Sequence, residues 1–298
     1  EINLNNNEKK VIYINGDSFV EGVGYNYEDT LIGLLDKKLS HKYLILNSSV
    51  TSYSPSIYYK KTQHFINLGL KIDHCLIFLD ISDIPDENFI EENEDGEIYD
   101  LRQEKTRKSI IKSNLYSFAK IYSNNFTSGK IISVLREIIG NYKSKLKKKF
   151  LASKKLNVSF FKITDEQINL YKSTHIDRSM WTFNKKYSDK WKNKGLAKAS
   201  TYLGKLFELL NENHINSYLI IYPNPGQILL NDENVHEIYW KKWSSDNNVN
   251  LVNLYKYFNK ISKEEIIKKY FIPGDVHWNK KGHYLVFKSL ENEIFNNF

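Results

Sequence analysis

The chain alternates short apolar runs rich in β-branched residues with segments whose apolar residues recur at helical spacing. The first run, at 11–14, ends in a glycine turn, and 30–39 then carries leucines three to four residues apart. A compact apolar run closed by a turn signal is typical of a buried parallel strand, and the spacing after it is typical of an amphipathic helix. The same pattern predicts strands at 43–46 and 75–79 with a helix at 56–70 between them. This alternation predicts βαβ units around a parallel sheet.

The alternation breaks after about residue 84 and resumes later in the chain. The resumed pattern predicts a helix at 198–213, strands at 217–222 and 249–254, and a closing helix at 282–298. We expect a single domain over 1–298, an α/β fold in which a mainly parallel sheet of about five strands, in flavodoxin-like order, lies between two helical layers. The segment 84–194 carries helical patterns at 115–122 and 130–139. It is predicted to be a helical insertion over the carboxyl edge of the sheet.

Composition narrows the class of protein. The chain has one cysteine, Cys75, so it forms no internal disulfide and no cysteine-based zinc site. No run of 18 apolar residues occurs, so the sequence predicts no membrane-spanning helix. The 43 Lys and Arg residues against 35 Asp and Glu give a net charge of +8, which either suits an anionic partner or reflects a general bias toward lysine, asparagine and isoleucine. No nucleic-acid-binding motif accompanies this charge, so no specific nucleic-acid partner is expected.

A serine directly follows the first predicted strand, in Gly16-Asp17-Ser18. Open α/β sheets bind ligands at the carboxyl ends of their strands, and a glycine turn there can present a hydroxyl beside backbone N–H groups. The same three residues also suit an ordinary turn or helix cap, in which Asp17 bonds to its own backbone. Ser18 is therefore a candidate nucleophile that needs a base.

A base is available near the other end of the chain, in 274–279 (Gly-Asp-Val-His-Trp-Asn). Histidine can take a serine proton near neutral pH, and a carboxylate then holds the imidazole in the required tautomer. Asp275 and His277 are two residues apart, so in an extended segment their side chains project to the same side. Ser18, His277 and Asp275 are thus the candidate catalytic residues, and His283 is interpreted as a packing or capping residue.

Four blocks in this order resemble the SGNH (GDSL-type) hydrolase family. The blocks are Gly16-Asp17-Ser18, then 46–53 (Leu-Asn-Ser-Ser-Val-Thr-Ser-Tyr), 78–83 (Phe-Leu-Asp-Ile-Ser-Asp), and Asp275-Val276-His277 with Asn279 and Gly282. The resemblance implies the three-layer α/β/α fold and ester hydrolysis without a cofactor or metal. It also implies Ser18 as nucleophile, His277 as general base and Asp275 as the residue that orients it.

The resemblance further implies an oxyanion hole made by the N–H of Ser18, the N–H of Ser49 and the side chain of Ser82. The family has glycine at the position of Ser49 and asparagine at that of Ser82. The first change keeps a backbone N–H, but a serine hydroxyl is shorter than an asparagine amide. Loss of one such donor costs about 3–4 kcal/mol in transition-state binding. The last block also differs from the family pattern. Much of the family places its aspartate three residues before the histidine, a position that Gly274 occupies in this chain.

The arrangement Asp-x-His-Trp-Asn is similar to the branch of the family that contains polysaccharide O-acetylation and related proteins. The expected function is therefore a serine esterase that removes acyl groups, acetyl above all, from a carbohydrate or cell-envelope saccharide. The alternatives are a polysaccharide O-acyltransferase with the same triad and a catalytically weak carbohydrate-binding protein. We expect a monomer whose partner is an acylated carbohydrate or another small ester, and the cell envelope rather than the cytoplasm. The lysine run at 143–149 is interpreted as a solvated helix face rather than a membrane contact.

Three residues are candidates for substrate binding. Asn224 and Gln227 follow the fourth predicted strand on the same sheet edge, where they either bind sugar hydroxyls or satisfy the loop backbone. Trp278, beside the candidate base, is the aromatic residue best placed to shape the pocket.

Four acids after the third strand suit either a hard cation or the capping of the next element: Asp80, Asp83, Asp86 and Glu87. Capping is the preferred interpretation, so no metal is expected.

Overall fold

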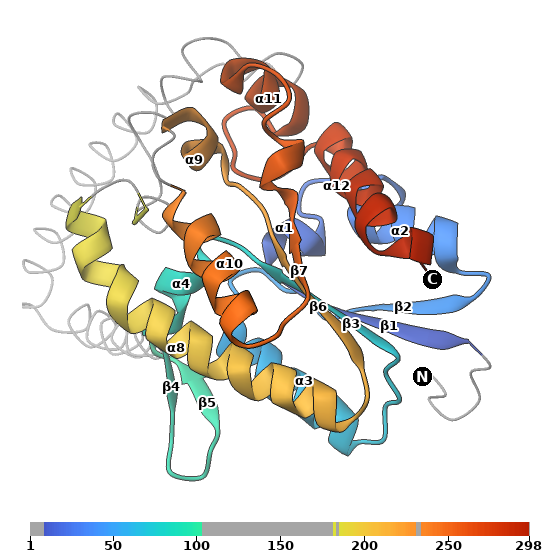
Figure 1. Cartoon of the computed structure of the whole chain (residues 1–298), viewed down its shortest axis with the longest axis vertical. Helices are drawn as coiled ribbons and strands as arrows, with labels where there is room; N and C mark the ends of the chain where they lie inside the picture. The colour runs from blue at the N-terminus through green and yellow to red at the C-terminus, as the bar shows by residue number, and fades with distance from the viewer. Residues whose placement is uncertain (1–8, 103–180, 183–184, 231–233, 298) are drawn as a thin grey trace, which may run out of the picture. The chain divides into compact units, whose positions relative to one another are not determined.

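A five-stranded parallel sheet forms the centre of the computed structural model, which describes residues 9–102, 181–182, 185–230 and 234–297. The strands are β1 (Lys10–Asn15), β2 (Tyr43–Asn47), β3 (His74–Leu79), β6 (Asn216–Ile221) and β7 (Leu251–Asn253). Their order is β2-β1-β3-β6-β7 (Figure 1). The order reverses between β1 and β3, which is where doubly wound sheets bind their ligands. The five-stranded flavodoxin-like sheet predicted from the sequence is confirmed.

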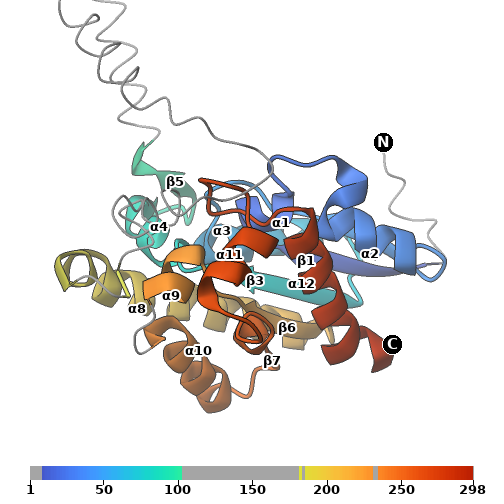
Figure 2. The same cartoon turned by 90° about the horizontal axis from the view of Figure 1, so that it is seen from above.

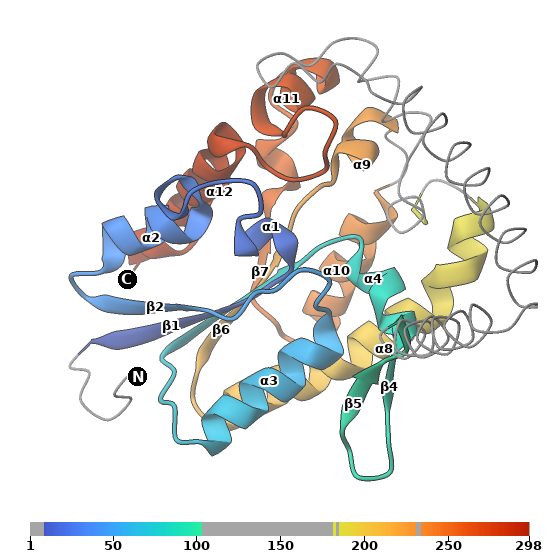
Figure 3. The ribbon, with the colours of Figure 1, turned by 180° about the vertical axis from the view of Figure 1, so that it is seen from behind.

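Both faces of the sheet are buried. Successive residues of a strand point to opposite faces: Ile12 and Ile14 enter one core, and Tyr13 between them enters the other. Helices α1 (Ser18–Glu21), α2 (Leu31–Leu39), α11 (Lys263–Tyr270) and α12 (Lys280–Glu293) cover the first core, and α3 (Pro55–Asn67), α8 (Lys185–Glu212) and α10 (Val235–Asp246) cover the second (Figures 2 and 3). Burial on both faces explains why the strands read as continuous apolar runs. The three-layer α/β/α class is thus confirmed.

The long helix α8 begins earlier than predicted. It starts at Lys185 instead of 198, so residues that the sequence analysis placed in the insertion belong to the second helical layer. α8 packs closely on the segment after β3, because a Cβ at Gly195 would lie 2.3 Å from the carbonyl oxygen of Ile84.

The remaining elements are η1 (Tyr27–Asp29), α4 (Asp83–Asp86), η2 (Glu87–Phe89), β4 (Ile90–Glu92), β5 (Ile98–Asp100), α9 (Pro225–Leu230), η4 (Leu254–Tyr257) and η5 (Phe295–Asn297).

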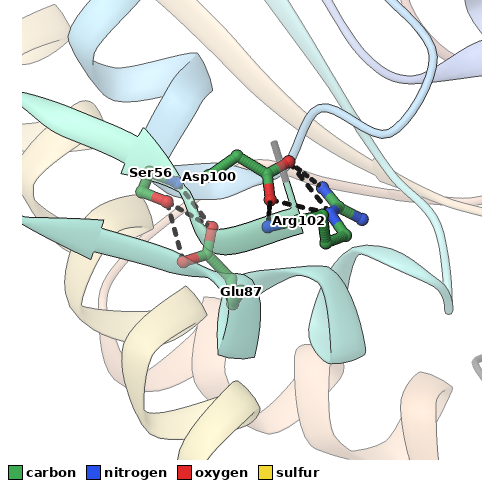
Figure 4. Close-up of polar contacts among 4 residues, drawn as sticks. All are labelled: Ser56, Glu87, Asp100 and Arg102. Atoms are coloured by element: carbon green, nitrogen blue, oxygen red, sulfur yellow. Dashed lines mark hydrogen bonds and ion pairs between the residues drawn. The ribbon is translucent and has the colours of Figure 1, made fainter. Parts of the chain in front are cut away.

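The chain divides into two compact units, one formed by 1–98 with 160–298 and the other by 99–159. Of the second unit the structure describes residues 99–102, where Arg102 forms a 2.7 Å ion pair with Asp100 (Figure 4). The helical patterns predicted at 115–122 and 130–139, and the lysine run at 143–149, lie outside the described residues. The single domain over 1–298 stays a prediction. Among the described helices, none is both long and apolar enough to cross a bilayer.

Candidate active site

Ser18 is the first residue of α1, on the turn that follows β1 at the carboxyl edge of the sheet (Figure 3). Asp17 caps this short helix, since its Oδ1 accepts a 3.0 Å hydrogen bond from the N–H of Phe19. The turn leaves no space for a side chain at Gly16, where a Cβ would lie 2.8 Å from Val20. The backbone thereby places Ser18, a residue that is 9% exposed, at the point where the strand order reverses.

Asp275 and His277 lie on the loop between α11 and α12. Gly274 has φ of 77°, a left-handed conformation that favours glycine, and it starts the turn. The N–H of Ile272 donates to the His277 carbonyl at 2.9 Å, and Phe271 pairs with Trp278, so the loop is closed by backbone bonds. These bonds fix the direction in which the His277 ring leaves the loop.

The structure brings Ser18, His277 and Asp275 into one chain of hydrogen bonds. The Ser18 Oγ lies 2.7 Å from His277 Nε2, although the two residues are 259 positions apart. His277 Nδ1 lies 2.5 Å from Asp275 Oδ1, and the same oxygen accepts the His277 backbone N–H at 3.0 Å. A carboxylate at Nδ1 keeps the proton there, so Nε2 is the nitrogen that accepts from the serine hydroxyl.

The environment of His277 favours a base that works near neutral pH. Burial lowers the pKa of His277, but the hydrogen bond and charge of Asp275, with smaller contributions from Asp17 and Asp80, outweigh burial and leave it raised. The hydrogen bond from His277 in turn lowers the pKa of Asp275. The Phe19 ring packs 5.0 Å from the imidazole and limits its rotation. Ionised Asp275 and neutral His277 are therefore the working states above the pKa of the histidine.

Three carboxyl groups converge behind the nucleophile. Oxygens of Asp17, Asp80 and Asp83 lie within 4.8 Å of one another, and all three side chains are buried. Burial and the neighbouring Asp80 charge raise the pKa of Asp17 to about 8, and burial raises the pKa of Asp80 and Asp83 as well. The three carboxyl groups therefore share at least one proton near neutral pH, as like charges this close together require.

The fourth acid of the sequence prediction, Glu87, has a structural role. Its Oε1 accepts hydrogen bonds from the N–H and Oγ of Ser56, at 2.7 and 2.8 Å, in the first turn of α3 (Figure 4). A buried carboxylate at a helix N-terminus satisfies orphan donors and complements the helix dipole. Glu87 thus caps α3, an earlier helix, and not the next element of the chain that the sequence analysis expected these acids to cap.

The three oxyanion donors implied by the resemblance differ in whether they already bond to another residue. No described residue accepts a hydrogen bond from the Ser18 N–H, which is therefore available. The N–H of Ser49, in contrast, donates to Asn47 Oδ1 at 3.1 Å. The Ser82 hydroxyl donates to Asp80 Oδ2 at 2.6 Å, and the Ser82 N–H donates to the same oxygen. The donors at positions 49 and 82 are both engaged inside the protein.

The candidate substrate-binding residues are more deeply buried than expected. Trp278 has no exposed surface and packs on Tyr222 and Phe19 with ring centroids 4.8 and 5.1 Å away, so it supports the site from behind and does not face a ligand. Asn224 is 2% exposed, and its Oδ1 accepts from the N–H of Gly226, which satisfies the loop backbone. Gln227 Oε1 also accepts from the Asn224 N–H within the loop, and its buried Nε2 has no partner among the described residues.

His283 packs as expected. It is 1% exposed, its Nδ1 accepts from the N–H of Leu31 at the start of α2, and burial lowers its pKa to about 4.

No family model and no curated protein matches the chain. Several solved structures align along most of its length. The esterase EstA of Pseudoalteromonas sp. is 13% identical with a TM-score of 0.43, over 97% of this chain and 98% of that one. An acetylxylan esterase from Geobacillus stearothermophilus is 11% identical with a TM-score of 0.45, over 96% and 94%. A member of the lipolytic G-D-S-L family from Veillonella parvula is 11% identical with a TM-score of 0.48, over 97% and 100%. At these values the geometry of the site, and not the similarity, carries the functional inference.

Proposed function

We propose that this chain is a serine esterase of the SGNH type that hydrolyses O-acyl esters of a saccharide. The observation that carries the proposal is the continuous hydrogen-bond chain from Ser18 through His277 to Asp275. A hydroxyl 2.7 Å from an imidazole whose other nitrogen bonds a carboxylate is the arrangement that activates a serine nucleophile.

The reaction follows from these three side chains. Ser18 Oγ attacks the ester carbonyl while His277 Nε2 takes its proton, and Asp275 stabilises the imidazolium that forms. His277 then gives the proton to the departing sugar oxygen, which leaves an acyl group on Ser18. Water, deprotonated by the same nitrogen, attacks the acyl-enzyme and releases the acid. Support for an acetylated saccharide as substrate comes from the Asp-x-His-Trp-Asn block and from the limited exposure of Ser18, which suits a small acyl group.

Covalent labelling tests the nucleophile directly. We expect diethyl p-nitrophenyl phosphate to modify the chain once, with the added mass on the peptide that contains Ser18. Because only an activated hydroxyl reacts readily, Ser18→Ala and His277→Ala are expected to stay unlabelled, whereas Ser245→Ala, at an exposed position on α10, is labelled as the natural chain is. Mass spectrometry of the digested protein provides the measurement. A label on another serine, or none, contradicts the proposal.

A second candidate function, a carbohydrate-binding protein of low turnover, is favoured by one observation. The Ser82 hydroxyl points its hydrogen at Asp80, so the third oxyanion donor is missing from the position where the family places an asparagine amide. Loss of one donor lowers the rate by about 10²–10³-fold. The triad is then intact but works with a weakened oxyanion hole.

The substitution Ser82→Asn is expected to raise kcat toward p-nitrophenyl acetate by about tenfold to a hundredfold, because the longer amide supplies the missing donor. Asp80 keeps the backbone N–H of residue 82 as a partner, so the loop is retained. Steady-state kinetics measure the effect, and Ser82→Ala, which removes the hydroxyl without adding a donor, is the matched control. An unchanged or lower kcat in Ser82→Asn would mean that position 82 does not face the oxyanion.

A further inference from the structure

The loop 48–54 leads from β2 to α3 and lies against the turn that carries the candidate nucleophile (Figure 3). It is anchored at its start, where the Ser48 Oγ accepts a 2.7 Å hydrogen bond from the Tyr13 hydroxyl. Two residues later, the Val50 N–H donates to the carbonyl of Gly16, which belongs to the nucleophile turn. At 3.3 Å this bond is longer than an ordinary N–H···O bond of about 2.9–3.0 Å. The backbone alone therefore joins the loop to the turn only weakly.

Glu21 makes a second and shorter contact between the same two segments. Its Oε2 accepts hydrogen bonds from the N–H of Thr51 at 2.7 Å and from the Thr51 hydroxyl at 2.6 Å. Hydrogen bonds to a charged acceptor are stronger than those between neutral groups. Ser18 and Glu21 are the first and last residues of α1 and are three positions apart, so they share one face of this short helix. The contact thus joins the loop to the helix face that carries the nucleophile.

The residue after Thr51 presents a free backbone donor. Ser52 has φ of 64°, a left-handed conformation that is uncommon for serine. Within the part of the chain that the structure describes, nothing accepts a hydrogen bond from the Ser52 N–H. The Ser18 N–H is free as well, whereas the Ser49 N–H is engaged within the protein. One free donor therefore lies on each of the two segments that Glu21 joins.

We propose that Glu21 is a positioning residue of the active site, which through Thr51 fixes the free N–H groups of Ser18 and Ser52 relative to each other. The inference rests on the proposed esterase function, because donors of this kind stabilise the oxyanion of ester cleavage when they are held in place beforehand. Glu21 acts through the loop and takes no part in bond making.

This role predicts an effect on turnover and not on stability. Donors that act on the transition state more than on the bound ester determine kcat more than KM. Glu21 and Thr51 are both exposed, and substitutions at exposed positions change the free energy of unfolding little. Loss of the contact should therefore lower kcat while KM and the thermal unfolding temperature stay nearly as they are.

Steady-state kinetics with p-nitrophenyl acetate test the role of Glu21. Glu21→Ala is expected to lower kcat about tenfold, less than the 10²-fold that a misplacement of about 1 Å can cost. Glu21→Gln keeps an oxygen that can accept from Thr51 and should retain most of kcat. Glu212→Ala, at the exposed end of α8, is the matched control for a lost carboxylate and should change neither constant. Stoichiometric labelling with diethyl p-nitrophenyl phosphate gives the concentration of active sites for each variant.

Two further measurements test whether Thr51 is the partner. Thr51→Val removes the hydroxyl and keeps the N–H, so it is expected to lower kcat about twofold to threefold alone and to have no further effect in Glu21→Ala. Hydrogen exchange of the peptide that covers 48–54, followed by mass spectrometry, is independent of turnover. Exchange should be faster in Glu21→Ala than in the natural chain and unchanged in Glu212→Ala.

The outcomes separate this inference from the proposed function. Where Ser18→Ala abolishes hydrolysis, the esterase stands, and any of three results overturns the positioning role: an unchanged kcat in Glu21→Ala, a loss that appears in KM instead of kcat, or an unchanged exchange rate at 48–54. Equal losses in Glu21→Gln and Glu21→Ala also overturn it, because the charge and not the contact with Thr51 then matters. If Ser18→Ala hydrolyses the ester as fast as the natural chain, the esterase fails, and the positioning role fails with it.

Discussion

Ser18→Ala is expected to lower kcat/KM toward p-nitrophenyl acetate by about 10⁴-fold or more. In other triad enzymes, removal of the nucleophilic serine lowers the rate by up to about 10⁶-fold. The donors at Ser49 and Ser82 are engaged within the protein, so the rate enhancement of this site, and hence the loss, is expected to be smaller. We expect Ser18→Ala to keep the turn and α1 folded, because alanine retains the backbone of α1 and the cap by Asp17. The expected loss therefore reflects chemistry and not folding.

Two comparisons make the result for Ser18→Ala decisive. His277→Ala is expected to lose about as much, and the double variant no more than either single one, because the two residues act as a unit. Ser245→Ala on α10 serves as the control for an unrelated serine, and thermal unfolding checks that all variants are folded. If the natural chain and Ser18→Ala share the same background rate, on this ester and on acetylated oligosaccharides, the chain is not a serine esterase.

The sequence predicted the sheet better than it predicted the helical layers. A buried parallel strand needs apolar residues on both faces, so runs such as 75–79 are visible without tertiary information. The first half of α8 gives no such signal, because 185–194 is rich in lysine and only Trp191 among its side chains is buried. That part contacts the segment after β3, where Asn88 Nδ2 donates to the Trp191 carbonyl, and no local sequence pattern encodes this contact.

For the candidate site, the residue identities were predictable but their surroundings were not. Ser18 and His277 carry motifs that resemble a known family, and the structure places their side chains 2.7 Å apart. The hydrogen bond that turns the Ser82 hydroxyl to Asp80, and the burial of Trp278, depend on how neighbouring loops meet. The deep burial of Gln227 is likewise a property of packing, although its position after the fourth predicted strand marked it as a candidate.

Asp275→Asn is expected to lower kcat by about 10³-fold. An asparagine amide can donate to His277 Nδ1, which places the imidazole proton on Nε2 and leaves no acceptor for the Ser18 hydroxyl. The same change at a buried triad aspartate costs about 10⁴-fold. The side chain of Asp275 is 48% exposed, so water partly replaces its support and the expected loss is smaller.

The pH profile distinguishes loss of orientation by Asp275 from a general disturbance of the site. In the natural chain the pKa of His277 lies above its ordinary value of 6.5, so kcat/KM is expected to fall as pH drops through that raised pKa. In Asp275→Asn the hydrogen bond and charge of Asp275, which are the largest contributions that raise the pKa of His277, are lost while burial, which lowers that pKa, remains. The acidic limb should therefore move to lower pH. Kinetics with p-nitrophenyl acetate between about pH 5 and 9 measure both limbs, with Asp246→Asn on α10 as a control for the lost charge. A limb that stays in place, or that moves to higher pH, would show that Asp275 does not set the protonation of His277.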